Sequence, residues 1–182
     1  MIPMARKVKK IFLTGYRATG KTSVAKELAR MLGCAAIDSD RMIEKQAGRT
    51  ISEIVEDEGW DGFRALEARV LKELLADSRP LVAALGGGAV LHEDVMEEAM
   101  KRCFVVLLTA PIEVICRRMA KDSKTSSTRP SLTGRDIYDE VVSVLEERGP
   151  LYRRFSHIEV DTQGRSPHQI ADEIRQEFQY VR

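Results

Sequence analysis

The sequence predicts an α/β fold in which a parallel β-sheet is covered by helices on both faces. Short apolar runs alternate with segments of helical periodicity along the 182 residues, which is the pattern of repeated strand–helix–strand units. A second observation is the glycine-rich segment 15–22, which separates the first apolar run from the first helical segment. Parallel α/β proteins bind phosphate groups at such a junction, so this segment is also the first candidate for a functional site.

The composition indicates one domain with a balanced charge, which we expect to span residues 1–182. The chain has 29 Lys and Arg against 28 Asp and Glu, a net charge of +1. This balance gives no electrostatic basis for nucleic acid or an anionic membrane as a main partner, so an anionic ligand must be held by a local site. The 3 cysteines lack the spacing of metal ligands and are expected to be reduced thiols.

The apolar runs are short throughout the sequence. None reaches the roughly 18 residues of a membrane span. The basic segment 1–10 is followed by a run of apolar residues that is too short for the core of a signal peptide. We therefore expect a cytoplasmic protein without a membrane partner, and we expect it to be a monomer.

Five apolar runs are the predicted strands of the sheet. Their lengths are ordinary for strands, and the parallel arrangement follows from the helical segments between them. The predicted strands are residues 9–14, 34–38, 81–85, 104–109 and 157–161.

The segments between the strands carry the signals of helices. Apolar residues recur at helical spacing after the first strand, and Gly33 follows them where a left-handed C-cap is expected. Thr50 and Glu53 have the spacing of a capping box that begins a short helix. Further helices are predicted over residues 61–77, 92–102 and 111–120.

The C-terminal third contains a break in this pattern. Residues 121–135 lack apolar periodicity and are rich in Lys, Ser, Thr and Arg, which predicts a mobile loop. The helix predicted over 136–148 ends at Gly149 and Pro150. Ser166 and Pro167 have the identities of an N-cap and a first helical residue, and they begin a last helix that extends to about residue 180.

Residues 15–22 match the phosphate-loop pattern G-x-x-x-x-G-K-[ST]. In this pattern glycines let backbone N–H groups turn toward phosphate oxygens at a helix N-terminus. Lys21 is expected at the β- and γ-phosphates, and the Thr22 hydroxyl at Mg²⁺. A chance match is the alternative, but the segment follows a predicted strand and begins a predicted helix, as the motif requires. The residues expected at the nucleotide phosphates are Gly15, Ala18, Thr19, Gly20, Lys21, Thr22 and Ser23.

Two carboxylates follow the second predicted strand. Asp38 and Asp40 stand at the carboxyl end of that strand, where open α/β sheets bind ligands, and side chains two residues apart point the same way in an extended segment. One could support Mg²⁺, and the other could hydrogen-bond or deprotonate a hydroxyl group of a substrate. The alternative is an Asx turn in which Asp40 caps the following helix.

Two further motifs have a structural and a functional interpretation each. Arg64 and Glu67 are one helical turn apart, a spacing that suits an ion pair fixing the direction of the guanidinium or, alternatively, a solvated surface pair. Gly86, Gly87 and Gly88 follow the third strand. They permit close approach of the backbone to a ligand, and the alternative is a plain tight turn.

Taken together, these motifs resemble shikimate kinase over nearly the whole chain, and their order along the sequence carries the resemblance. They are the segment 15–22, Asp38-Ser39-Asp40, Phe63-Arg64-x-x-Glu67, Gly86-Gly87-Gly88, Arg129-Pro130, and Glu146 with Arg148, Pro150, Leu151 and Tyr152. The resemblance implies a three-layer P-loop NTPase-type fold with a mobile lid, approximately residues 121–135, and a five-stranded parallel sheet of order 2-3-1-4-5. It also implies transfer of the γ-phosphate of ATP to the 3-hydroxyl of shikimate in aromatic amino-acid biosynthesis, with Mg²⁺ as cofactor.

The resemblance also implies roles for residues that would bind the acceptor. Asp40 would hold shikimate hydroxyls and is the best candidate for the base, while Asp38 would orient the Mg²⁺ shell. Arg64 and Arg148 would grip the shikimate carboxylate, because a guanidinium is a planar fork with a permanent charge. Glu67 would orient Arg64. Backbone contacts to the substrate would come from Gly86, Gly87 and Gly88.

On the nucleotide side, the resemblance assigns two arginines. Arg129, in the predicted lid, would act with Lys21 on the transferring phosphoryl group. Arg118 would lie over adenine, although the adjacent Arg117 is an alternative, and residues 161–167 would pack around the base. The histidines at 92, 157 and 168 are scattered and are expected at the surface or in packing, not in catalysis.

The sequence departs from the usual family pattern at the loop and at the lid. Ala18 stands where glycine is frequent, Ser131 stands where the lid usually has leucine, and residues 121–128 lengthen the lid. Altered lid dynamics or nucleotide affinity is expected, with the chemistry retained. The alternatives within enzymes are a gluconate kinase-like enzyme or a nucleoside monophosphate kinase, and the alternative outside enzymes is a non-catalytic binding domain of this family.

Overall fold

A computed structural model describes residues 8–121 and 136–181 of the chain. Its centre is a parallel sheet whose strands lie in the order β2-β3-β1-β4-β5. The strands are β1 (Lys10–Thr14), β2 (Ala35–Asp38), β3 (Leu81–Ala84), β4 (Phe104–Thr109) and β5 (Ile158–Asp161). The predicted order 2-3-1-4-5 is confirmed, and each predicted strand is present to within one residue at each end.

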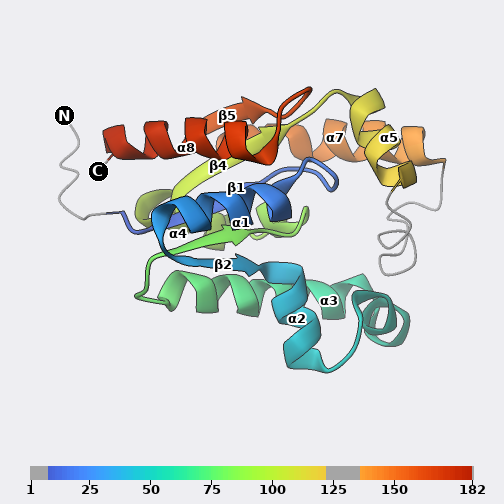
Figure 1. The fold of residues 1–182 in the computed structure, drawn as a ribbon. Coiled ribbons are helices and arrows are strands. Elements are labelled where there is room, and N and C mark those ends of the chain that lie inside the picture. Colours follow the sequence, from blue (N-terminus) through green and yellow to red (C-terminus); the bar gives the residue numbers. More distant parts are fainter. Residues whose placement is uncertain (1–7, 122–135, 182) are drawn as a thin grey trace.

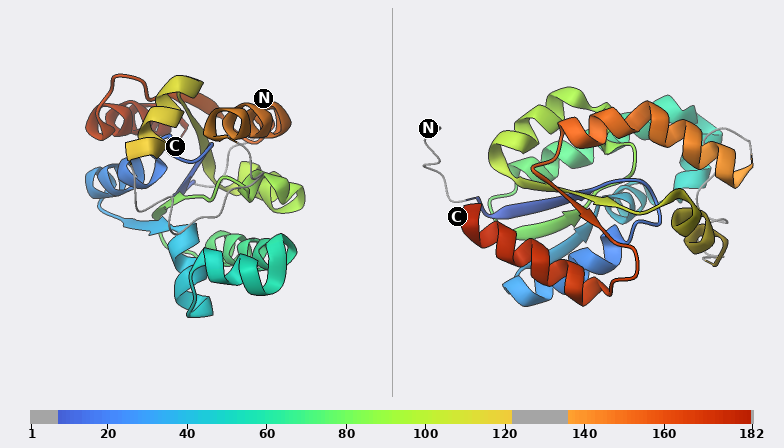
Figure 2. Two further views of the ribbon diagram at one scale, coloured as in Figure 1. Left: turned by 90° about the vertical axis from the view of Figure 1, so that its right-hand side faces the viewer. Right: turned by 90° about the horizontal axis from the view of Figure 1, so that it is seen from above.

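Helices cover both faces of this sheet (Figures 1 and 2). Helices α1 and α8 lie on one face, and α3, α4 and α7 lie on the other, as the right-hand view of Figure 2 shows. The helices are α1 (Lys21–Leu32), α2 (Ser39–Ala47), α3 (Ile51–Ala76), the 3₁₀ helix η1 (Ala89–Leu91), α4 (Glu93–Arg102), α5 (Ile112–Lys121), α7 (Ile137–Arg154) and α8 (Pro167–Val181).

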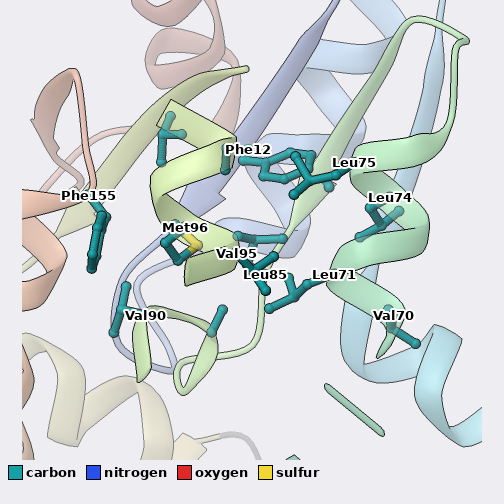
Figure 3. Packing of buried hydrophobic residues seen from close by; sticks show 14 of the residues in the cluster. Phe12, Val70, Leu71, Leu74, Leu75, Leu85, Val90, Val95, Met96 and Phe155 are labelled. Atoms are coloured by element: carbon teal, nitrogen blue, oxygen red, sulfur yellow. The ribbon is translucent and has the colours of Figure 1, made fainter. Parts of the chain in front are cut away.

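Alternating residues of the central strand enter two separate cores. Ile11 and Leu13 of β1 pack with α1 and α8, while Phe12 packs with α3 and α4 on the opposite face, where Figure 3 shows it beside Leu75. Since successive side chains of a strand point to opposite faces, a strand buried on both sides must be apolar throughout. This arrangement holds the C-terminal ends of the strands in one rigid row.

The helix signals of the sequence are found at their expected positions. Gly33 is a left-handed C-cap of α1 with φ of 65°, and Thr50 and Glu53 form both hydrogen bonds of the capping box at the start of α3. The short helix that begins there and the helix predicted over 61–77 run into each other, with a break at Gly59, whose φ is 71°. The Ser166 hydroxyl accepts from the Gln169 amide at 3.2 Å and so caps α8.

The predicted end of the helix over 136–148 is wrong, because α7 continues through Pro150 to Arg154. Proline inside a helix costs about 3 kcal/mol. The extra turn buries Tyr152 and Phe155 in the core beside α4, which stabilises it by about 2–3 kcal/mol for each side chain. Burial of the two aromatic rings therefore outweighs the cost of the proline.

The predicted lid lies outside the described residues apart from Lys121, and Arg129 lies outside them as well. Within the described part of the chain, every helix is too short or too polar to span a bilayer.

Candidate active site

The predicted site residues gather at the C-terminal ends of the strands. The loop 15–20 follows β1, Asp38 ends β2, and Gly86 to Gly88 follow β3. In Figure 1 the arrows of β1 and β2 point toward the side on which α2 and α5 lie. β1 is the strand at which the chain order reverses, which is the place where open α/β sheets form their ligand crevice.

The phosphate loop requires glycine at both of its ends. Gly15 has φ of 130°, and a Cβ atom there would lie 2.3 Å from the Leu108 carbonyl oxygen. Gly20 has φ of 97° at the N-cap of α1. Ala18 has φ of 60° and is the single non-glycine residue with positive φ in the described ranges. The departure from glycine at this position therefore places an alanine in a left-handed conformation that costs roughly 1–2 kcal/mol.

Lys21 and Thr22 begin α1 and face the inside of the loop. The Lys21 ammonium donates to the carbonyl oxygens of Gly15 at 2.8 Å and Tyr16 at 2.7 Å, so its charge is held within the loop. The Thr22 hydroxyl donates to Asp38 Oδ2 at 2.7 Å. A hydroxyl and a carboxylate this close are a pair of hard oxygen donors that suits Mg²⁺.

The two aspartates after β2 have different positions. Asp38 Oδ1 accepts from the Arg41 amide at 3.2 Å, so Asp38 is the N-cap of α2. The alternative in which Asp40 caps this helix is wrong, because the helix already begins at Ser39. Asp40 lies in the first helical turn, where its buried carboxylate faces Gly86: a Cβ atom on that glycine would lie 2.5 Å from Asp40 Oδ1.

Arg64 and Glu67 form a largely buried ion pair, and the interpretation as a solvated surface pair is wrong. Arg64 Nη1 donates to Glu67 Oε2 at 2.5 Å, and the two side chains are 19% and 1% exposed. The guanidinium carbon also lies 5.4 Å from the ring centre of Trp60 and 5.2 Å from that of Phe63. Two aromatic rings and a carboxylate thus hold the direction of this guanidinium.

The three glycines after β3 make room for these charged side chains. A Cβ atom on Gly86 would meet Asp40 Oδ1 and also Glu67 Oε1, at 2.8 Å, and one on Gly88 would lie 1.8 Å from Arg64 Nη1. Neither glycine has positive φ, so conformational freedom is not the reason for glycine here. The segment does form a tight turn, in which the Ala89 amide donates to the Gly86 carbonyl at 3.1 Å, but the glycines are required because side chains approach its backbone closely.

Arg148 and Tyr152 reach the same glycine segment from α7. Arg148, which is 8% exposed, places Nη1 3.5 Å from the Gly87 carbonyl oxygen, and the Tyr152 hydroxyl donates to this oxygen at 2.5 Å. Burial raises the pKa of Tyr152 well above its ordinary value, so the phenol stays a donor. Tyr152 belongs to the motif around Arg148, but the sequence gives no separate role for it.

Sequence reasoning missed the ion pair between Arg17 and Glu140. Arg17 stands at a variable position of the loop, and Glu140 is buried in α7, so the pair joins the loop to the helix after the predicted lid. The adjacent Tyr16 is buried too, and desolvation raises its pKa. Arg17 fills a position of the loop pattern that any residue can occupy, and Glu140 belongs to no motif, so the sequence contains no signal for this pair.

Two cavities meet at the residues described above. One, of about 60 Å³, is lined by charged and aromatic side chains that include Arg64, Arg148, Glu67, Trp60 and Phe63. The other, of about 490 Å³, is lined by the loop and the end of β2, including Lys21, Thr22, Ser23 and Asp38. Both are lined by Arg17, Asp40, Ile51 and Gly87. A ligand on the phosphate loop and a ligand beside Arg64 would therefore meet at Asp40.

Arg118 occupies a position beside the loop on the β5 side. Its Nη1 donates to the Ala18 carbonyl at 3.2 Å and to the Thr162 hydroxyl at 2.9 Å, and its Nη2 donates to the Thr162 carbonyl at 3.0 Å. These contacts place Arg118 between the loop and the segment 161–167.

The fold and the two joined cavities define a P-loop kinase of small molecules. Comparison with known proteins identifies the family. The family model described as "Shikimate kinase" matches residues 17–179, and the chain therefore belongs to the shikimate kinase family.

Individual relatives agree with this assignment. The chain is 43% identical to shikimate kinase 2 of Enterobacter sp. (strain 638), over 90% of this chain and 92% of that one. It is 41% identical to the shikimate kinase of Syntrophus aciditrophicus (strain SB), over 94% and 92%. A structure of the shikimate kinase from Acinetobacter baumannii in complex with shikimate superposes with a TM-score of 0.88 at 35% identity, covering 95% of this chain and 94% of that one.

A gluconokinase from Sinorhizobium meliloti 1021 is also similar in structure, with a TM-score of 0.55 at 19% identity and coverage of 97% and 94%. At this identity the likeness shows the shared fold alone. The gluconate kinase-like alternative is therefore not favoured, and neither is a non-catalytic binding domain, since the relatives named above are kinases.

Proposed function

We propose that this protein transfers the γ-phosphoryl group of ATP to the 3-hydroxyl of shikimate. The observation that carries the proposal is the cavity beside the phosphate loop, which is lined by two arginines, Arg64 and Arg148, and by a carboxylate, Asp40. An acceptor that has both a carboxylate and ring hydroxyls suits this set of side chains. The relative from Acinetobacter baumannii was solved in complex with shikimate, which supports the same acceptor.

In this proposal the two arginines bind the acceptor carboxylate. Arg64 is directed by Glu67 and by two aromatic rings, and Arg148 is buried beside the Gly87 carbonyl. Because both guanidinium groups are partly shielded from water, their attraction for a carboxylate is stronger than that of exposed arginines. The acceptor is thereby oriented with its hydroxyl groups toward Asp40.

Asp40 then holds the attacking hydroxyl and accepts its proton. It lines both cavities, so its carboxylate lies where the acceptor and the γ-phosphate meet. The backbone around Gly86 to Gly88 completes the acceptor site. Phosphoryl transfer depends mainly on positioning and charge neutralisation, so a carboxylate in this place is sufficient without a covalent nucleophile.

Lys21 and the backbone of the loop bind the phosphates of ATP. The Lys21 ammonium exchanges its contacts with two loop carbonyls for phosphate oxygens when ATP binds, and it then neutralises charge that develops during transfer. Arg118 lies at the adenine end, and Arg129 is proposed to act on the transferring group from the lid.

Thr22 and Asp38 would hold Mg²⁺ at the phosphates. Among the described residues, no group of three or more His, Cys, Asp and Glu side chains could hold a metal by itself. Phosphate oxygens of the nucleotide and water would therefore supply the remaining ligands beside the Thr22–Asp38 pair. When bound, the ion would neutralise phosphate charge. We also propose that the protein is a single-domain monomer and that it is located in the cytoplasm.

The first experiment measures ADP release with ATP, Mg²⁺ and a panel of shikimate, quinate, gluconate and nucleoside monophosphates. We expect ADP release that depends on shikimate. Nuclear magnetic resonance of the product should show the phosphate on the 3-oxygen. An enzyme active on gluconate or a nucleotide but inactive on shikimate would refute the proposal.

Two variants then separate the acceptor site from the phosphate site. Arg64→Ala should raise the KM for shikimate far more than the KM for ATP, whereas Lys21→Ala should depress kcat with both substrates saturating. Arg69→Ala is the matched control, because Arg69 lies on the same helix, is 55% exposed and pairs with Glu73. Equal effects of Arg64→Ala on both KM values would contradict its assignment to the carboxylate.

A further inference from the structure

Glu67 has a second partner besides Arg64. His92 Nε2 lies 3.0 Å from Glu67 Oε2, the oxygen that also accepts from Arg64 Nη1. The His92 side chain is 14% exposed and the Glu67 side chain 1%. An ionised carboxylate can only accept hydrogen bonds, so the facing nitrogen of His92 carries the hydrogen. One buried oxygen is thus shared between the guanidinium and the imidazole.

The backbone of His92 is held at both sides. Its amide donates to the Ala89 carbonyl at 3.1 Å, and this hydrogen bond lies at the end of η1. Its carbonyl accepts from the Met96 amide at 2.9 Å, and this hydrogen bond lies at the start of α4. Since η1 follows Gly88 directly, His92 is tied to the glycine segment and to helix α4, whose Val95, Met96 and Ala99 are buried in the core. The imidazole therefore extends from a fixed point toward Glu67 on α3.

The other oxygen of Glu67 has a different environment. Within the described residues, Oε1 is buried without a hydrogen-bond donor and faces the Cα of Gly86. The terminal torsion of a glutamate is soft, so contacts at Oε2 decide how the carboxylate is turned. Arg64 alone could move together with the carboxylate, because both lie on the same helix. His92 is the contact that ties Glu67 Oε2 to a part of the chain outside α3.

We infer that His92 is a positioning residue, which fixes the carboxylate of Glu67 so that Arg64 is directed toward the carboxylate of the acceptor. The inference rests on the proposed function. Without His92 the Arg64–Glu67 pair keeps its mutual attraction but loses its fixed orientation relative to the glycine segment. Binding of the acceptor must then restore that orientation, which weakens the affinity for the acceptor and leaves the nucleotide site unaffected.

The test compares His92→Leu, which removes the donor, with His92→Gln, whose side-chain amide can replace it. His92→Leu should raise the KM for shikimate, and its Kd by calorimetry, about tenfold, as for loss of one hydrogen bond to a charged group. The KM for ATP should change less than about twofold, and His92→Gln should recover most of the loss. His168→Gln is the control, because His168 also pairs with a glutamate, Glu27, but is 64% exposed.

A double variant decides whether His92 acts through Arg64. In the Arg64→Ala background, His92→Leu should raise the Kd for shikimate less than about twofold, since there is no guanidinium left to position. A full tenfold effect in that background, or an unchanged Kd in the single variant, would overturn the inference. Wild-type enzyme without shikimate turnover would instead refute the proposed function, so the two failures are distinguishable.

Discussion

Gly88→Ala is expected to displace Arg64 from the acceptor cavity while preserving the fold. The added Cβ would lie 1.8 Å from Arg64 Nη1, 2.3 Å from Cζ and 2.6 Å from Nη2. These atoms form the far end of a flexible side chain, so the guanidinium moves and the backbone stays. Gly88 has φ of −94° and ψ of −6°, which alanine also adopts, so the backbone is not strained.

The size of the effect follows from these distances. Carbon and nitrogen atoms in contact are about 3.5 Å apart, so the guanidinium must retreat by about 2 Å, which breaks the hydrogen bond to Glu67. Loss of a hydrogen bond to a charged group costs about 1.5–3 kcal/mol. We therefore expect the KM for shikimate to rise roughly 10- to 100-fold, with a change in the KM for ATP below about twofold.

Coupled ADP release and thermal unfolding together test this reasoning. Gly149→Ala is the matched control for the KM: it lies inside α7, and the nearest side-chain atom to its added Cβ would be Arg153 Nη1 at 3.7 Å, so the KM for shikimate should stay within about twofold of the wild type. Because Gly149 directly precedes Pro150, the proline ring opposes a Cβ at this position in a helix, and the variant should not raise the free energy of unfolding. The reasoning is refuted if Gly88→Ala leaves the KM for shikimate within twofold, or if it raises that KM equally in an Arg64→Ala background.

Two further predictions concern stability. Tyr152→Phe removes the buried donor to the Gly87 carbonyl and should lower the free energy of unfolding, measured in urea, by about 1–3 kcal/mol. The control is Tyr138→Phe at a 47% exposed position, which should change this free energy by less than about 0.5 kcal/mol. Equal effects of the two variants would contradict the role of the Tyr152 hydroxyl. Burial lowers the pKa of His157 below its ordinary value of 6.5, and its Nδ1 accepts from the Val105 amide. Because the unfolded state then binds more protons, this stability is fully present above pH 6.5 and is lost as the pH falls below that value. His157→Gln cannot be protonated, so the unfolding midpoint should fall less from about pH 7 to about pH 5 than in the wild type, and an equally steep fall would argue against the buried neutral ring.

Local features of this protein were predictable from the sequence because their causes lie within a few residues. Gly33 caps α1, Thr50 and Glu53 form a capping box, and the left-handed Gly20 ends the phosphate loop, as the residue types indicate. The strands were recognisable because a sheet buried on both faces needs runs of apolar residues. The order of the strands came from the resemblance to a family, since neighbouring strands are far apart in the sequence.

Features that depend on packing were not predictable in this way. Pro150 locally indicates the end of a helix, yet burial of Tyr152 and Phe155 continues α7 past it. Asp38 and Asp40 have the same residue type and the same strand end, and the start of α2 at Ser39 decides which of them caps the helix. At Pro150 the tertiary environment supplies more free energy than the local preference.

The sequence by itself determined the phosphate loop, the strand and helix segments, and the candidates Asp40, Arg64 and Arg148. Only the tertiary structure decided how these side chains are held. His92 is 25 residues from Glu67, and Arg17 is 123 residues from Glu140, and neither pair has a periodic signature. The physical reason is that a buried carboxylate must find a donor from whichever element packs against it, and the fold alone decides which element that is.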